Sequence, residues 1–433
     1  MNYERQIEIF VDYFKRQEKK REDFKIGIEL EHFVIDQDTL ETISYYGKGG
    51  VGETLKELEE KGWTGIYEGE NILGLYKGNK IISLEPGSQI ELSIGPEKNI
   101  KDLEKEYFSF LRDLIPILEK KNQTLITLGY HPVSKIEDIK IIPKQRYDYM
   151  FEYFKTRGSH AHNMMKGTAS LQITVDYESE EDYIKKFKIA NGLSPVLYAL
   201  YDNGYYFEGG IWQKHSLRSF IWANCDDDRC GMARGSFIEG FGYGKYAEYI
   251  LNTPPIFVFD GEKTYPTGNK LVREIFDPDK YSIEMLEHVL TMVFPDVRTK
   301  KYIEIRMMDS VPYPLNFSAV ALIKGLFYNE SNLEKLYKFV EDISEEEIVK
   351  AKKDLFEKGL QAKYKGKTLL EIGNYLLELA THALSEEERK YLKPLEELIR
   401  NGKNPYEITK EKAGFGKKES LKWCLLNNIK AFR

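Results

Sequence analysis

The chain has 433 residues, of which 42% are hydrophobic and 31% charged, and its formal net charge is −7. This composition is typical of a folded globular protein and excludes an intrinsically disordered one. A nucleic-acid binder is also disfavoured, because such proteins concentrate lysine and arginine on one surface to neutralise phosphates. No apolar run approaches the roughly 18 residues of a membrane span. Only three cysteines occur, which favours a reducing compartment, so we expect a cytoplasmic protein with no nucleic-acid or membrane partner.

The hydrophobic periodicity predicts an α+β fold. A helix over residues 3–21 comes first, then a strand over residues 25–35 and an alternating segment over residues 81–93 that a Pro-Gly turn interrupts. Later strand-like and helical runs follow in mixed order: strands at 123–128, 168–177, 256–259 and 302–307, and helices at 51–61, 101–121, 180–201, 243–251 and 282–293. After about residue 316 the pattern is helical to the end of the chain. We expect a catalytic α+β unit, residues 1–315, with a helical C-terminal subdomain, residues 316–433, packed on it.

Carboxylates recur at alternating positions of the predicted strands. Glu29 and Glu31 share one strand face, because side chains two residues apart point the same way. The same alternation places further acids in two other strand segments: Glu85, Glu91 and Glu304. Acids on neighbouring strands repel one another unless a cation holds them together. Hard oxygen ligands suit magnesium bound together with substrate phosphates, whereas the alternative is that each glutamate is a solvated strand residue.

Arginines accompany these acids. Arg306 follows Glu304 by two residues and is expected on the same face, and Arg218 and Arg229 flank a stretch rich in both charged and aromatic residues. The planar guanidinium matches phosphate and carboxylate groups, so the combination of acids and arginines favours phosphoryl transfer. The alternative for any one arginine is a surface ion pair.

Several of these motifs resemble the plant and proteobacterial type of glutamate–cysteine ligase. The matching segments follow the family's order and cover nearly the whole chain: residues 27–31 (Gly-Ile-Glu-Leu-Glu), 67–75, 82–93 (with Leu-Glu-Pro-Gly-Ser-Gln-Ile-Glu-Leu at its centre), 164–176, 218–232, and 294–306. The segment 82–93 is the most specific of them.

The resemblance implies a fold and a set of roles. It implies a glutamine-synthetase-like α+β fold, in which a curved, mainly antiparallel sheet forms a cup surrounded by helices. It implies metal ligation by the five glutamates and by a sixth residue, Gln172. It implies that Arg306 faces the transferring phosphoryl group or the substrate as a catalytic residue. It also implies that four residues lie near the amino-acid pocket and bind substrate: Arg218, Trp222, Asp226 and Arg229.

The resemblance further implies a reaction: ATP- and Mg²⁺-dependent ligation of the L-glutamate γ-carboxylate to the L-cysteine amine through a γ-glutamyl phosphate, as in glutathione biosynthesis. Magnesium and arginine would supply the electrostatic stabilisation, and no protein nucleophile is required. Two alternatives stay open. One is a related carboxylate–amine ligase with another amine as acceptor, and the other is a non-catalytic binder of nucleotide or amino acid. We expect a monomer or homodimer.

Overall fold

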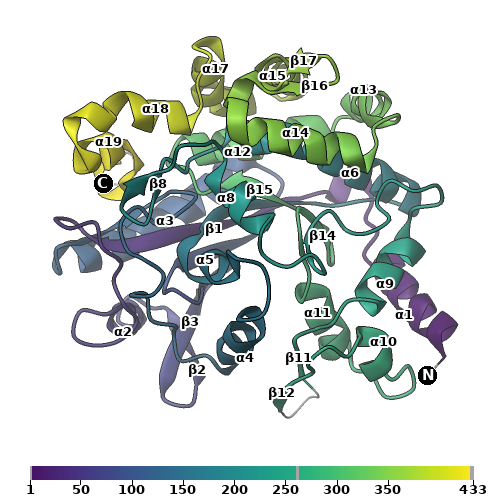
Figure 1. Ribbon diagram of the computed structural model, residues 1–433, viewed down its shortest axis with the longest axis horizontal. Coiled ribbons are helices and arrows are strands. Elements are labelled where there is room, and N and C mark those ends of the chain that lie inside the picture. The colour runs from purple at the N-terminus through teal and green to yellow at the C-terminus, as the bar shows by residue number, and fades with distance from the viewer. Residues whose placement is uncertain (1, 260–262, 430–433) are drawn as a thin grey trace.

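The structure is a computed structural model that describes residues 2–259 and 263–429. Its centre is one antiparallel sheet with the spatial order β14-β15-β7-β1-β5-β4-β3-β2, and β6 pairs with the far end of β1 (Figure 1). The strands of this sheet are β1 (Ile26–Asp36), β2 (Thr64–Glu68), β3 (Asn71–Lys77), β4 (Lys80–Leu84), β5 (Ile90–Glu97), β6 (Gln123–Ile126), β7 (Ser170–Val175), β14 (Val297–Thr299) and β15 (Ile303–Asp309). The predicted α+β class and the mainly antiparallel sheet are confirmed.

Helices surround this sheet. The longer ones are α1 (Tyr3–Lys15), α2 (Val51–Glu59), α3 (Ile100–Glu119), α4 (Gln145–Phe154), α6 (Glu180–Gly192), α9 (Tyr243–Leu251), α11 (Ile283–Thr291), α12 (Leu315–Phe327), α13 (Glu330–Val340), α14 (Glu345–Lys358), α15 (Leu369–Ala383), α17 (Lys393–Arg400) and α18 (Pro405–Lys412). Shorter helices include α5 (Ala161–Gly167), α7 (Ser194–Leu200) and α8 (Leu217–Trp222). The helix predicted over residues 180–201 is broken after α6, because Pro195 begins a new helix and lacks the amide that would continue the old one.

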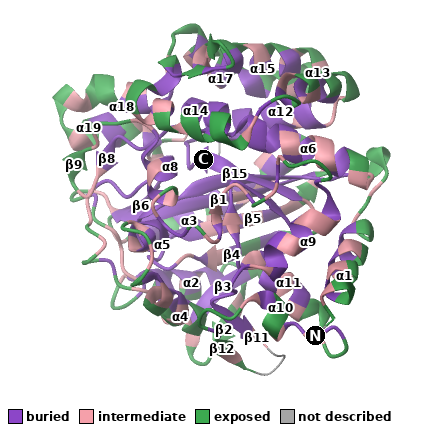
Figure 2. Ribbon diagram, turned by 45° about the vertical axis from the view of Figure 1, so that its right-hand side comes forward, coloured by how far each residue is buried: buried purple, intermediate pink, exposed green. Residues whose placement is uncertain are grey.

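The two faces of the sheet differ in chemistry, as the alternation in β1 predicts. Ile28 and Leu30 point to the apolar face, where they are 2% and 4% exposed, and this face packs against α3 and α12. Figure 2 shows the central strands and α12 as buried, while the outer sides of α13 and α18 are exposed. The opposite, polar face of the sheet carries the alternating acids of β1, and this is the face on which a functional site can form.

Strand register aligns the acids on this polar face. Glu29 lies opposite Ser93 of β5 and Gln172 of β7, and Glu31 lies opposite Glu91. Directly opposed residues on adjacent strands place their Cβ atoms roughly 5 Å apart. Acids predicted from two separate segments, now β1 and β5, therefore meet on one surface.

The C-terminal helices pack tightly on the rest of the chain. Helices α13, α14, α15 and α17 lie together above the sheet in Figure 1. Helix α12, with which the predicted subdomain begins, is buried along most of its length between the sheet and α15. One hydrophobic cluster extends from Phe10 of α1 to Leu395 of α17. The division at residue 315 remains a prediction, and the core crosses it without interruption.

Candidate active site

A cavity of about 240 Å³ opens over the polar face of the sheet. Eight of the predicted site residues line it: Glu29, Glu31, Glu85, Glu91, Gln172, Arg218, Trp222 and Arg306. The remaining wall comes from elements far apart in the sequence, including α4, α5 and the segment that follows α11. The strand alternation predicted the four acids of this lining and Arg306, whereas Gln172 and Trp222 were expected there only from the resemblance.

Hydrogen bonds fix the orientation of Glu31 at the floor of the cavity. Its carboxylate accepts from the backbone amide and the hydroxyl of Ser170 at 2.7 and 2.8 Å, and from the side-chain amide of Gln172 at 3.1 Å. The Gln172 oxygen in turn accepts from Arg306, which also donates to Glu304 at 2.8 Å. A continuous polar chain therefore joins a floor carboxylate to an ion-paired arginine.

Burial and repulsion between neighbouring acids raise the pKa values of three carboxylates that line the cavity, Glu29, Glu31 and Glu91. Burial, with repulsion from Glu91 and Glu304, raises the pKa of Glu29 to about 7. Burial, with repulsion from Glu85 and Glu91, raises the pKa of Glu31 to about 8. A group of acids in this state binds either protons or a cation, because their ionised forms are unstable together.

Glu304 has a different environment from the other acids. It is fully buried behind the cavity wall, and Arg298, Lys300 and Arg306 all lie within 2.8 Å of its carboxylate oxygens. Burial alone would raise its pKa, but these three cations outweigh that effect and hold the pKa well below the usual value. Glu304 therefore holds these three cationic side chains in place. This geometry does not favour the predicted direct contact of Glu304 with a metal ion.

The cavity chemistry fits magnesium in part. Glu29, Glu31, Glu85 and Glu91 offer hard oxygen ligands, whereas both polar atoms of Gln172 are already hydrogen-bonded. Within residues 2–259 and 263–429, no three His, Cys, Asp or Glu side chains converge to hold a metal ion by themselves. Mg²⁺ keeps several waters and commonly binds through one or two carboxylates plus substrate phosphates, so a spread set of acids fits an ion that arrives with a nucleotide.

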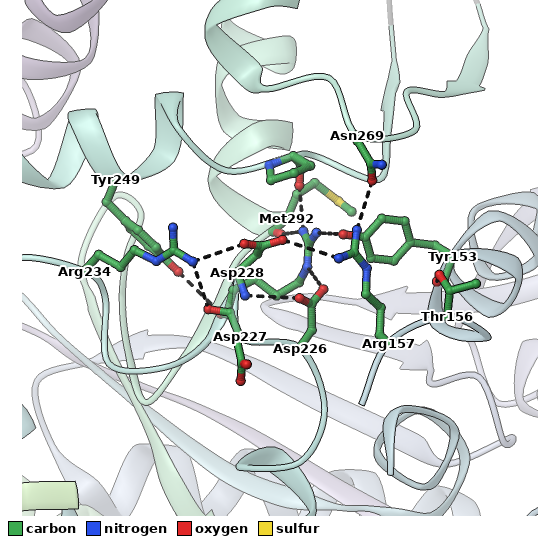
Figure 3. Close-up of polar contacts among 12 residues, drawn as sticks. Tyr153, Thr156, Arg157, Asp226, Asp227, Asp228, Arg234, Tyr249, Asn269 and Met292 are labelled. Atoms are coloured by element: carbon green, nitrogen blue, oxygen red, sulfur yellow. Dashed lines mark hydrogen bonds and ion pairs between the residues drawn. The ribbon is translucent and has the colours of Figure 1, made fainter. Parts of the chain in front are cut away.

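Two predicted substrate residues, Asp226 and Arg229, lie outside the cavity lining. Arg229 is fully buried and donates to Asp226, to Tyr153, and to the carbonyl oxygens of Pro254 and Met292, at 2.6–2.8 Å. Figure 3 shows this network, in which Asp226, Tyr153 and Met292 approach from different elements. The arginine therefore joins the turn after α8 to α4 and to the end of α11.

The sequence reasoning missed several cationic residues of the cavity. Arg146 at the start of α4, Arg298 of β14 and Lys300 after it all line the wall. Arg298 lies directly opposite Glu304 in the β14–β15 pair, so its position follows from the register once the hairpin is known. No strand register or periodicity in the sequence predicts the position of Arg146, because it reaches the cavity only when α4 folds over the sheet.

The open antiparallel sheet, with acids and arginines over one face, has the features expected of a carboxylate–amine ligase. A family model described as glutamate-cysteine ligase family 2 matches residues 25–420, and the chain belongs to that family. Chloroplastic glutamate–cysteine ligase of Nicotiana tabacum is 30% identical over 400 residues, covering 90% of this chain and 76% of its own length. Chloroplastic glutamate–cysteine ligase B of Oryza sativa subsp. japonica is also 30% identical, covering 90% and 80%.

The fold is similar to that of a solved enzyme. The crystal structure of glutamate–cysteine ligase from Francisella tularensis, in complex with AMP, aligns with a TM-score of 0.59 at 12% sequence identity. The alignment covers 93% of this chain and 87% of that one. The likeness supports the predicted cup-shaped ligase fold.

The expectation of a cytoplasmic location is wrong by these comparisons, because the curated relatives are named as chloroplastic. A low cysteine count reflects redox conditions and does not distinguish one reducing compartment from another. None of the helices in the described part of the chain is long and apolar enough to cross a membrane.

Proposed function

We propose that this protein joins the γ-carboxylate of L-glutamate to the amine of L-cysteine, using ATP and Mg²⁺ and passing through γ-glutamyl phosphate. One observation carries the proposal: a single cavity holds four carboxylates beside five cationic side chains, namely Arg146, Arg218, Arg298, Lys300 and Arg306. Membership of the family and the activity named for the plant relatives support the same reaction.

The cationic side chains stabilise the phosphoryl group during its transfer. A γ-carboxylate oxygen of glutamate attacks the γ-phosphorus of ATP, and ADP leaves. The charge on the transferring group calls for preorganised cations in a site shielded from water. Arg306 and Lys300 meet that need, because Glu304 fixes both of them at 2.8 Å. Magnesium, held with the phosphates by Glu29, Glu31, Glu85 and Glu91, would supply further charge neutralisation.

Arg218 is suited to bind a substrate carboxylate. It is 3% exposed and donates through Nη1 to the carbonyl oxygens of Arg306 and Met307 at 3.1 and 3.3 Å. Its Nε has no hydrogen-bond partner within the described residues, although it is buried in the cavity wall beside Trp222. A buried guanidinium donor left without a partner favours an anionic ligand group at this position.

The second half-reaction needs no protein nucleophile. The cysteine amine attacks the acyl carbon of γ-glutamyl phosphate, and inorganic phosphate leaves as the amide forms. The chain's own Cys225 is buried and lies outside the cavity lining, which fits this absence of covalent catalysis.

The test measures ADP release with ATP, Mg²⁺ and glutamate, with cysteine, another amino acid or no acceptor added in turn. We expect cysteine to give the strongest stimulation, with γ-glutamylcysteine confirmed by mass. If a different amine gives the strongest stimulation, that amine is the acceptor in place of cysteine, and the proposed activation of the glutamate carboxylate still stands. No ADP release with any pair of amino acids would reject the ligase and favour a non-catalytic binder.

A further inference from the structure

A second cavity, of about 270 Å³, lies behind the turn that joins β4 to β5. Three segments far apart in the sequence enclose it: the chain between β1 and α2, the β4–β5 turn, and the loop that leads into α4. None of its lining residues lines the acidic cavity. The second cavity is therefore a separate compartment, and the reaction described above does not use it.

Hydrogen bonds between these segments fix the walls of the second cavity. The Tyr46 hydroxyl, from the chain before α2, donates to the carbonyl oxygen of Ile141 at 2.9 Å. In the same loop, the amide of Ile142 donates to the carbonyl oxygen of Pro86 in the β4–β5 turn at 3.1 Å. A cavity whose walls are already fixed loses little conformational freedom when a ligand enters it.

Two hydroxyl groups are available to a ligand inside the cavity. Ser88 is 2% exposed, and its Oγ has no hydrogen-bond partner within residues 2–259 and 263–429. On a different wall, Ser44 Oγ accepts from the amide of Tyr46 at 3.3 Å, which leaves its own proton free to donate. A buried hydroxyl without a partner is costly, so Ser88 favours a polar ligand at this position.

Asp138 and Lys140 supply one charge of each sign to the same cavity. Both side chains are exposed, and neither forms an ion pair or a hydrogen bond with the part of the chain that the structure describes. They flank Ile139, whose carbonyl oxygen accepts from Lys166 at 3.0 Å, so the backbone between them is held in place. A ligand with a cationic and an anionic group close together would match both charges.

We propose that the second cavity binds a small α-amino acid as its zwitterion. The α-ammonium group contacts Asp138, the α-carboxylate contacts Lys140, and the hydroxyls of Ser44 and Ser88 donate to ligand oxygen atoms. A volume of about 270 Å³ is small for a ligand site, and glycine at position 47 adds no side chain to the wall, so the site suits serine or glycine. This binding site is independent of the proposed function.

The β4–β5 turn connects the second cavity to the acidic one. Ser88 lines the second cavity, whereas Glu85 and Gln89 line the acidic cavity. The amide of Ser88 donates to the carbonyl oxygen of Glu85 at 2.9 Å, and the amide of Glu85 donates to that of Gln89 at 2.9 Å. A ligand on Ser88 therefore orders the segment that positions Glu85, and a second ligand at Glu85 then has less ordering to accomplish. We expect serine to tighten the binding of ADP with Mg²⁺, and this coupling rests on the proposed function.

Calorimetric titration without ATP tests the binding site, with L-serine, N-acetyl-L-serine and ethanolamine as probes. N-acetyl-L-serine lacks the cationic amine and ethanolamine lacks the carboxylate, so each should bind at least about 10-fold more weakly than L-serine. Asp138→Asn and Lys140→Gln should each weaken L-serine by a similar factor. Ser88→Gly should weaken it by about 5-fold, because glycine accepts the φ of 73° at this position and only the hydroxyl is lost.

Matched controls separate this cavity from the rest of the loop and from the active site. Lys135→Gln and Glu137→Gln remove exposed charges of the same loop that do not line the cavity, and they should leave the affinity for L-serine unchanged. Arg218→Gln alters the acidic cavity and should also leave it unchanged. The proposal is overturned if L-serine does not bind, if Asp138→Asn and Lys140→Gln bind it normally, or if Arg218→Gln abolishes its binding.

Titration of ADP with Mg²⁺, in the presence and absence of saturating L-serine, tests the coupling. We expect ADP to bind about 5-fold more tightly with L-serine present, and Asp138→Asn to remove this difference. An unchanged affinity for ADP while L-serine is bound overturns the coupling. If ADP does not bind under either condition, the proposed nucleotide-dependent reaction is rejected, and the titration with L-serine alone still decides the binding site.

Discussion

Gln172 donates a hydrogen bond of 3.1 Å from its side-chain amide to Oε1 of Glu31. The same amide accepts from Arg306, so one residue sets the distance between an acid of the cavity floor and a cation of its wall. Glu31 and Arg306 thus remain separate from each other, and Arg306 forms its ion pair with Glu304 instead.

Replacing Gln172 with alanine should reduce activity far more than stability. We expect kcat to fall by roughly 100-fold, as when one preorganised donor is lost from an active site, and the free energy of unfolding to fall by about 1–3 kcal/mol. Gln123→Ala is the matched control, because Gln123 is equally buried and donates to the Gly49 carbonyl in another part of the fold. An equal loss of activity in both variants would show that Gln172 acts only through stability.

Glu29→Gln should abolish turnover and yet stabilise the metal-free protein at alkaline pH. The pKa of Glu29 is raised to about 7, so the stability of the folded state is greatest when Glu29 is protonated and is lost as pH rises through 7. An uncharged amide removes that loss, which we expect to be about 1–3 kcal/mol at pH 8 and small at pH 5. Thermal unfolding at both pH values measures it, with exposed Glu70→Gln as the control. A lower Tm for Glu29→Gln at pH 8 would contradict the repulsion among the acids.

Two buried histidines should make the protein acid-sensitive. Burial lowers the pKa of His32 to about 4 and that of His131 to about 3. The unfolded chain therefore binds protons first as pH falls below 6.5, so stability is complete above that pH and declines toward pH 4, by up to about 1.4 kcal/mol per pH unit for each ring.

Urea unfolding between pH 7 and pH 5 tests this prediction with His131→Asn. The asparagine oxygen can replace Nδ1, which accepts from the backbone amides of Val133 and Ser134, but it does not titrate. The variant should show a shallower pH dependence than the intact protein. An unchanged slope would mean that His131 does not contribute.

Arg229→Lys should be strongly destabilising although the charge is kept. A lysine cannot reproduce the fork of four hydrogen bonds to Asp226, Tyr153, Pro254 and Met292, and the Asp226 carboxylate would be left poorly paired in the interior. We expect a loss of about 3 kcal/mol in the free energy of unfolding. Arg234→Lys, at an exposed ion pair with Asp228, should cost less than about 0.5 kcal/mol. Equal effects would show that the buried network contributes no more than the exposed pair.

The sequence predicted the acids of the cavity but few of its cations. Glu29, Glu31 and Glu91 alternate with aliphatic residues, so a period of two places them together on whichever face is not the core. Arg146 and Lys300 carry no periodic signal, because their positions depend on how α4 and the β14–β15 hairpin fold over the sheet. Glu304 fits the same alternation as the other acids, and only the structure shows that three cations surround it.

The fold was predictable where hydrophobic periodicity was regular. Strands β1, β4, β5, β7 and β15 and helix α9 lie close to their predicted ranges. Strands β2 and β3 escaped prediction because glycines interrupt the segment and several of its apolar side chains, Ile66 and Tyr76 among them, stay exposed. Helix α4 was missed because six of its ten residues are aromatic or aspartate, which favour a helix only weakly.

The register of β1 against β5 restricts which mutations the sequence can accept during evolution. Glu31 lies opposite Glu91, and Leu30 opposite Leu92, in the same ladder. A slip of one residue would turn Leu92 toward the cavity and Glu91 into the hydrophobic interior, damaging catalysis and folding together. A single-residue insertion or deletion in either strand is therefore expected to be selected against for two reasons at once, the loss of the cavity acids and the loss of the core.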